Sequence, residues 1–147
     1  MDGIAVCKAF VLEELVVRMY HERQSQQMCL VHALNALFQK PQFTAKSLDE
    51  ICYTLNDSRW FNPHRMSVDR ICFDKLHALI VNVPTKSFLP LWKGRHWYTI
   101  LRLDNGKLIN LDSKLSQPEE IHDIYEHCRR LLMKTGDANQ LFLVVEL

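Results

Sequence analysis

The chain has 147 residues, of which 48% are hydrophobic and 24% charged, and its formal net charge is +1. This length suits one domain, and the composition is typical of an ordinary soluble globular protein. The balanced charge argues against a nucleic-acid partner. No apolar run approaches the roughly 20 residues that a membrane span needs, so we expect no stable membrane insertion.

The first nineteen residues are apolar enough to raise the question of a signal peptide. Their start is acidic, however, and Lys8, Glu13 and Glu14 interrupt the apolar stretch. A signal peptide has a basic start and an unbroken apolar middle. We therefore predict a short amphipathic helix in an N-terminal extension, residues 1–19, of a cytoplasmic protein.

The cysteines do not form a metal-binding or disulfide pattern. Their number is odd, their spacings are wide, and no C-x-x-C pair occurs. They are Cys7, Cys29, Cys52, Cys72 and Cys128. We expect free thiols in a reducing compartment, and a free thiol is most often a buried core residue.

Two helices are predicted in the first half of the chain. The first, residues 28–39, carries an apolar face at three- and four-residue steps and ends before Pro41. The second, residues 47–55, begins with a serine and a glutamate in capping-box spacing. Residues 69–83 are ambiguous, and a short helix running into a strand fits them.

The second half of the chain predicts strands. Residues 96–103 (HWYTILRL) and 107–112 (KLINLD) flank the turn sequence DNG, which is a strong hairpin signal. Residues 117–136 predict a helix with Pro118 near its first position. Residues 141–147 (LFLVVEL) predict a fully buried strand. Because helices come first and strands later, the predicted fold class is α+β.

Cys29 lies at the start of the first predicted helix. A helix N-terminus or a nearby imidazolium lowers a thiol pKa from about 8.5 to roughly 3.5–7.5, and the thiolate is the form that attacks. The preceding segment, residues 24–27, offers amide donors to a developing oxyanion. From this chemistry alone two interpretations stay open: a nucleophile, or a core thiol on the apolar face of the helix.

A thiol nucleophile also needs a base and a group that orients the base. Among seven histidines, His96 differs because it opens a strand directly after the basic loop LWKGR. With a three-residue hairpin loop, Asp112 opposes Tyr98 and shares a face with His96; a two-residue loop turns Asp112 away. The three-residue register also places the apolar residues together on the other face, so we predict that register.

Three blocks of this sequence resemble the Josephin family of deubiquitinating cysteine proteases. The blocks are YHERQ with CLVHALNALFQ, then LPLWKGRHW, then NLDSKL, and FTAKSLDEI, NPHR and LIVNVP fit in order between them. The match is closest to the short members without a long tail. The resemblance covers roughly residues 20–147 and implies a papain-like α+β fold, with N-terminal helices packed on a small antiparallel sheet.

The resemblance also implies a chemistry. Cys29 matches the nucleophile, His96 the general base, Asp112 the orienting Asp or Asn, and Gln24 the oxyanion-hole glutamine. The implied reaction hydrolyses the isopeptide bond after the C-terminal glycine of ubiquitin, so the implied partners are ubiquitin and ubiquitinated proteins. No metal or cofactor is implied, and we expect a monomer.

The separation of Cys29 from His96 is shorter than is usual in the family. Between NPHRMS and ICFDK the family carries a further segment, a helix and a core strand, so we expect a catalytic domain shortened near residues 66–72. A lost strand would leave an unpaired sheet edge and bare apolar surface. Two hypotheses therefore stand beside an active deubiquitinase. One is a catalytically impaired isoform that binds ubiquitin or is unstable, and the other is a papain-like enzyme with another substrate.

Overall fold

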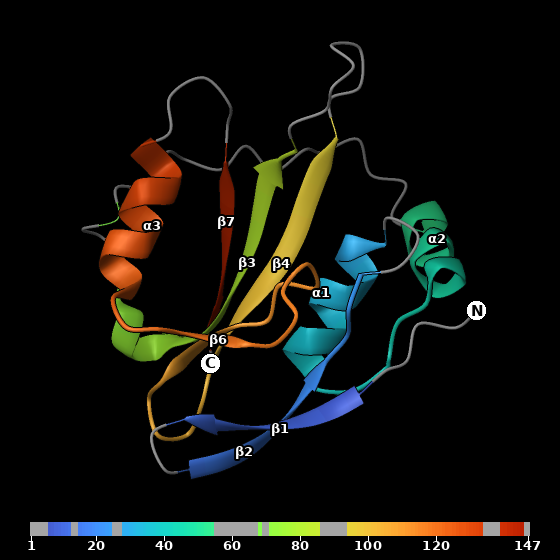
Figure 1. Ribbon diagram of the computed structural model, residues 1–147. Helices are drawn as coiled ribbons and strands as arrows, with labels where there is room; N and C mark the ends of the chain where they lie inside the picture. The colour runs from blue at the N-terminus through green and yellow to red at the C-terminus, as the bar shows by residue number, and fades with distance from the viewer. Residues whose placement is uncertain are drawn as a thin grey trace.

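An antiparallel sheet of five strands lies at the centre of this computed structural model (Figure 1). The structure describes residues 6–12, 15–24, 28–54, 68, 71–85, 94–133 and 139–145. Its elements are β1 (Val6–Leu12), β2 (Leu15–His21), α1 (Cys29–Phe38), α2 (Ala45–Thr54), the 3₁₀ helix η2 (Phe73–Lys75), β3 (Leu76–Pro84), β4 (Arg95–Arg102), β5 (Leu108–Asn110), β6 (Glu119–Ile121), α3 (Ile124–Met133) and β7 (Gln140–Val145). The fold class is α+β, as the sequence predicts.

The strand order of the sheet is β6-β5-β4-β3-β7. β3 pairs with β4 on one side and with β7, from the far end of the chain, on the other. β7 is therefore an edge strand, and its Phe142 and Val145 are 44% and 48% exposed. The prediction of a fully buried last strand is wrong, because an apolar run alone does not distinguish an edge strand from a central one.

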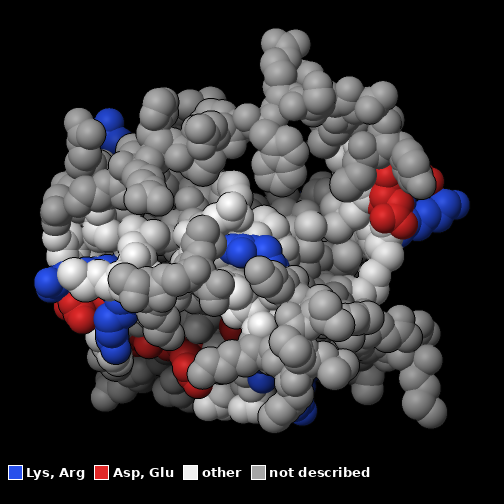
Figure 2. Space-filling view, turned by 90° about the horizontal axis from the view of Figure 1, so that it is seen from above, with Lys and Arg blue, Asp and Glu red and all other residues white. Residues whose placement is uncertain are grey.

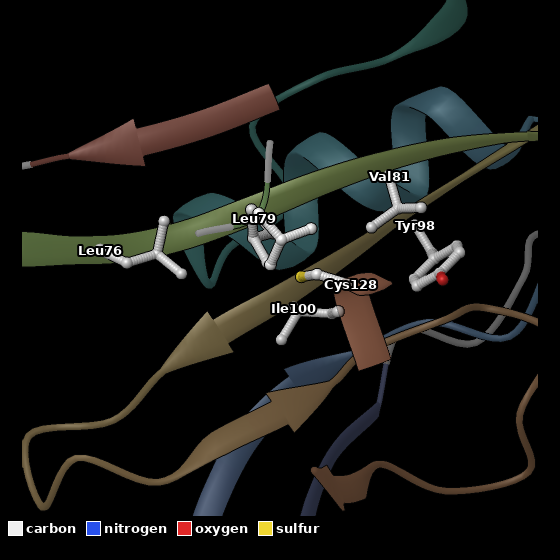
Figure 3. Packing of buried hydrophobic residues seen from close by; sticks show 7 residues of the cluster. Leu76, Leu79, Val81, Tyr98, Ile100 and Cys128 are labelled. Carbon is white, nitrogen blue, oxygen red and sulfur yellow. The ribbon is translucent and has the colours of Figure 1, made fainter. Parts of the chain in front are cut away.

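Helices cover both faces of the sheet (Figure 1). On one face, a buried cluster joins Ala36 of α1 to Ala78 of β3, Leu101 of β4, Ile109 of β5 and Leu111 just after β5. On the other face, a second set surrounds Cys128 of α3: Leu76, Leu79, Val81, Tyr98 and Ile100 (Figure 3). The sequence pattern of the hairpin predicts one core face, and the second exists because α3 covers the alternate residues.

The two N-terminal helices differ in their relation to the sheet. α1 packs on β4, where Thr99 Oγ1 donates a 2.7 Å hydrogen bond to the carbonyl oxygen of Ala33. α2 lies on the outer side of α1, away from the sheet (Figure 1). Its N-terminus is capped reciprocally by Thr44 and Ser47, so it starts two residues earlier than predicted. Within the described residues, no helix is both long and apolar enough to cross a membrane.

β1 and β2 pair as a two-stranded antiparallel sheet and do not form the amphipathic helix that we predict from the sequence. The register runs from Val6 opposite His21 to Leu12 opposite Leu15. The segment is rich in valine and aromatic residues, which favour strands over helices. Met19, near the end of β2, is 2% exposed and packs in the core with α1 and the sheet.

The region before α3 also differs from the prediction of one helix over residues 117–136. Residues Glu119–Ile121 pair with β5 as the edge strand β6. α3 starts only at Ile124, because Asp123 caps it: its carboxylate accepts the backbone N–H of Glu126 at 2.8 Å. The aspartate cap gives a hydrogen-bond acceptor to a backbone N–H at the helix start. A proline near the first turn has no backbone N–H of its own and supplies no such acceptor. In the ambiguous stretch 69–83, η2 runs directly into β3, as one interpretation predicts.

Candidate active site

Three residues singled out by the sequence meet at the end of the sheet where β3 ends and β4 begins. Cys29 is the first residue of α1, and its Sγ lies 3.8 Å from the carbonyl oxygen of Arg95 at the start of β4. His96 is the second residue of β4, and its Nε2 lies 2.7 Å from Oδ1 of Asp112, two residues after β5. Figure 2 looks down on this end, where the described charged side chains form small groups of both signs.

The hairpin register brings His96 and Asp112 together. β4 and β5 pair Ile100 with Asn110, and the N–H of Leu103 donates to the carbonyl oxygen of Lys107 at 2.8 Å. This closes the three-residue loop that we predict, and Gly106 in that loop has φ +83°, a conformation that glycine adopts readily. If this register continues for two more residues, Asp112 lies opposite Tyr98. Tyr98 is two positions after His96, so the side chains of Asp112 and His96 are on the same face of the sheet.

The Asp112 carboxylate is held by its own turn. Its Oδ1 also accepts the backbone N–H of Lys114 at 2.8 Å, and its N–H donates to Oδ1 of Asn110 at 3.0 Å. The His96 ring is 3% exposed and stacks on Tyr98 with centroids 6.0 Å apart. Burial alone would lower the pKa of His96, but the hydrogen bond and charge of Asp112, together with the nearby Cys29 thiol, outweigh it and raise that pKa to about 9. The ring is thus held as an imidazolium at neutral pH.

The pKa of Cys29 lies below its usual value. Burial alone would raise it, but the His96 side chain and the backbone N–H groups of Trp97 and Leu30 stabilise the thiolate more strongly. Because Nε2 of His96 is bonded to Asp112, the ring has Nδ1 left for the thiol. Nδ1 is buried and makes no well-formed hydrogen bond within the described residues. Such contacts are often loose before substrate binds.

The other described cysteines behave differently from Cys29. Cys128 is fully buried under α3, and burial raises its pKa to about 11, whereas Cys72 is exposed. All three are free thiols, and the side chains of Cys7 and Cys52 lie outside the described residues. A lowered pKa is the condition of a reactive thiolate, and Cys29 meets it whereas Cys128 does not. No cluster of three or more His, Cys, Asp or Glu that could hold a metal ion occurs in the described part of the chain.

Gln24 lies beside the Asp112 turn. Its backbone N–H donates a 2.7 Å hydrogen bond to the carbonyl oxygen of Ser113. Its side chain is half-buried, and the buried Oε1 has no hydrogen-bond partner among the described residues. Residues 25–27, which complete the predicted donor segment, lie outside the residues that the structure describes. The Gln24 amide is therefore next to the site and is not engaged through its oxygen.

Sequence reasoning missed three polar residues around the site. His21 is 2% exposed, and its Nε2 lies 3.0 Å from the carbonyl oxygen of Asp112. Glu22 and His32 form a carboxylate–imidazole pair through Oε2 and Nδ1. The available signal was their occurrence within YHERQ and VHALN, next to residues already implicated. A contact between side chains of two separate elements produces no periodic pattern in the sequence, so sequence reasoning cannot locate it.

Comparisons with known proteins point in one direction. The family model described as Josephin matches residues 24–66. A Josephin-like protein of Drosophila melanogaster is 32% identical over 163 residues, covering 86% of this chain and 73% of the relative. Josephin-2 of Homo sapiens is 30% identical, covering 71% of this chain and 73% of the relative. A Josephin-like protein of Arabidopsis thaliana is 31% identical over 72% of this chain and 41% of its own length.

The length of one alignment carries further information. The alignment with the Drosophila relative runs over 163 residues, which exceeds the 147 residues of this whole chain. The relative therefore has residues within the aligned region that this chain lacks.

Proposed function

This chain belongs to the Josephin family, and on that premise we propose that it is a thiol-dependent deubiquitinase. Its α+β architecture is the papain-like fold of the family, and membership supports a deubiquitinase type of function. The finer proposal is hydrolysis of the isopeptide bond after the C-terminal glycine of ubiquitin. The observation that carries it is the 2.7 Å His96–Asp112 hydrogen bond beside the lowered-pKa thiol of Cys29.

In the first half of the reaction the Cys29 thiolate attacks the isopeptide carbonyl, and a C–S bond forms. The carbonyl oxygen becomes an oxyanion, to which the side-chain N–H of Gln24 donates. The C–N bond then breaks, and the His96 imidazolium gives its proton to the departing lysine amine. The product is a thioester between Cys29 and the ubiquitin C-terminus.

In the second half of the reaction water replaces the amine. His96, now neutral, removes a proton from the water as it attacks the thioester carbonyl. The C–S bond breaks, ubiquitin leaves with a free carboxylate, and Cys29 returns as the thiolate beside the imidazolium. Asp112 orients the ring in both halves and keeps its pKa high enough for it to act as the acid. The partners are ubiquitin and ubiquitinated proteins.

We assign this activity to a catalytic domain over residues 20–147, shortened near residues 66–72, in a cytoplasmic monomer. Support for the shortening comes from the Drosophila alignment, which is longer than this chain. The same observation favours a second candidate, a catalytically impaired Josephin protein that binds ubiquitin without turnover. Catalytic residues can persist on a fold that has lost part of its core.

Intact mass after incubation with a ubiquitin C-terminal vinyl electrophile tests the first candidate. The purified chain is compared with Cys29→Ala, and Cys72→Ala serves as the control that removes an exposed thiol. We expect one ubiquitin adduct on the wild type and on Cys72→Ala, and none on Cys29→Ala. An adduct on Cys29→Ala would contradict the proposed nucleophile. No adduct from a cooperatively folded wild type would favour the second candidate.

A further inference from the structure

Gln24 lies in a segment that no regular secondary structure supports. β2 ends at His21, α1 begins at Cys29, and residues 22–24 belong to neither. An oxyanion donor must sit about 2.7–3.1 Å from the oxygen that becomes charged, and a misplacement of about 1 Å can cost roughly 100-fold in rate. The position of Gln24 therefore depends on the side-chain and backbone bonds that tie this segment to its surroundings.

One side of the segment is tied to the Asp112 turn. The N–H of Gln24 donates to the carbonyl oxygen of Ser113 at 2.7 Å, and Nε2 of His21 lies 3.0 Å from the carbonyl oxygen of Asp112. These bonds place Gln24 relative to the residue that orients His96. They do not place it relative to the thiol, which belongs to a different element.

The other side of the segment is tied to α1 through Glu22. Its carboxylate bonds to Nδ1 of His32 with one oxygen and accepts the hydroxyl of Tyr20 with the other. The Glu22 and His32 side chains are only 12% and 10% exposed, so little water competes with the pair. His32 stands three residues after Cys29 on the same helix, and residues at this spacing are neighbours on one face.

A further contact ties the end of β2, directly before the segment, to the same helix. Tyr20 donates its backbone N–H to Oε1 of Gln39 at 2.9 Å, and Gln39 caps the C-terminus of α1 with φ 54°. The chain from Tyr20 to Glu22 thus bonds to α1 near both ends of the helix, and Glu22 makes the bond on the side of the thiol.

We propose that the Glu22–His32 pair is a positioning device that sets where Gln24 presents its side-chain amide relative to Cys29. This rests on the proposed function, because an oxyanion donor matters only for acyl transfer. Losing Glu22 removes the carboxylate that joins the segment to His32 of α1. Gln24 then loses its alignment with the thiol, while the thiol itself and its His96 partner stay in place.

The test compares Glu22→Ala and Glu22→Gln with wild type. Glutamine keeps the shape of the side chain and one of its two acceptor oxygens, whereas alanine keeps neither oxygen. Glu126→Ala is the matched control, because Glu126 pairs with Arg130 on the exposed side of α3. Three rates are measured: turnover of a ubiquitin C-terminal fluorogenic amide, alkylation of Cys29 by iodoacetamide, and hydrogen exchange of the Gln24 backbone N–H. Alkylation displaces iodide and forms no oxyanion, so it reports on the thiol alone.

For Glu22→Ala we expect kcat to fall about 10- to 100-fold with KM within about twofold, and Glu22→Gln to recover most of kcat. Alkylation should stay within about twofold of wild type, and the Gln24 N–H should exchange at least about tenfold faster in Glu22→Ala. A fall in alkylation parallel to kcat overturns the inference, because the pair would then support the thiol and not Gln24.

Unchanged kcat or unchanged Gln24 exchange in Glu22→Ala also overturns the inference. A wild type that folds but does not turn over the ubiquitin amide contradicts the proposed function separately. Exchange of the Gln24 N–H then still decides whether Glu22 holds the segment. If Glu22→Ala lacks a thermal transition, Glu22→Gln provides the same three measurements, with expected changes of the same sign and smaller size.

Discussion

The Nε2 atom of His96 lies 2.7 Å from Oδ1 of Asp112, although 16 positions of chain separate the two residues. The tight turn between β4 and β5 brings them together, and one residue more or less in that turn would place them on opposite faces of the sheet. The carboxylate is held in place by the N–H of Lys114 before any substrate arrives. The hairpin therefore determines both the position and the charge of the imidazole.

Substitution of Asp112 should separate its orienting role from its charge. In Asp112→Asn the side-chain amide oxygen can still accept the His96 N–H, so this variant should retain turnover within about tenfold of wild type. Asp112→Ala removes the acceptor and should lose about 100- to 1,000-fold in kcat. Steady-state hydrolysis of a ubiquitin C-terminal amide measures both. Equal losses in the two variants would contradict an orienting hydrogen bond.

The thiol should react far below the pH expected of an ordinary cysteine. His96 and backbone N–H groups lower the pKa of Cys29, while burial raises that of Cys128 to about 11. Iodoacetamide at pH 6–7 should therefore label Cys29 and leave Cys128 unlabelled, as peptide mass mapping would reveal. In His96→Ala the burial that raises the Cys29 pKa is no longer opposed by the imidazolium. Labelling at pH 6 should then drop by about tenfold or more.

The pH dependence of turnover should follow the Cys29–His96 pair. In the proposed mechanism the imidazolium protonates the amine. Its pKa of about 9 lies above the ordinary 6.5, so activity should fall as pH rises through about 9. The acid limb should follow protonation of the thiolate, below the ordinary pKa of cysteine. Because the two groups interact, both limbs report on the pair.

Asp112→Asn supplies the control for this profile. Asp112 raises the His96 pKa through its hydrogen bond and its charge, so the neutral amide should move the alkaline limb to lower pH. An alkaline limb that stays in place in Asp112→Asn would argue that another group controls it.

The core between the sheet and α3 should be sensitive to truncation. Ile100 is fully buried against Cys128 and its neighbours, so Ile100→Ala should lower the free energy of unfolding by about 2–5 kcal/mol. Leu132 on α3 is 40% exposed, and Leu132→Ala should change the free energy of unfolding by no more than about 0.5 kcal/mol. Urea denaturation followed by circular dichroism measures both values. Similar losses of stability at the two positions would contradict the packing of Ile100 against Cys128 of α3.

Much of the fold could be predicted from the sequence because local patterns specify it. The register that joins His96 to Asp112 follows from period-two alternation and one loop length, and both are visible in the sequence. The N-terminal hairpin was missed because alternation there is weak, so the strand preference of valine and aromatic residues decided the outcome. The start of α3 was misplaced because Asp123 caps it more effectively than Pro118 begins it.

Some residues of the candidate site could likewise be predicted from the sequence, and others could not. Cys29 and His96 could be singled out by their positions at the start of a helix and of a strand. Glu22 and His32 could not, because their contact depends on how the segment after β2 packs on α1. Such a contact arises only in the assembled tertiary structure.

The contact between α1 and β4 matters while the protein is being synthesised. Cys29 leaves the ribosome before the strand that completes its surroundings, since Arg95 follows 66 positions later. Until β4 docks, the thiol lacks both the His96 ring and the Trp97 N–H, two of the groups that lower its pKa in the folded protein. In the proposed mechanism, the thiol therefore becomes a reactive nucleophile only after β4 has docked on α1.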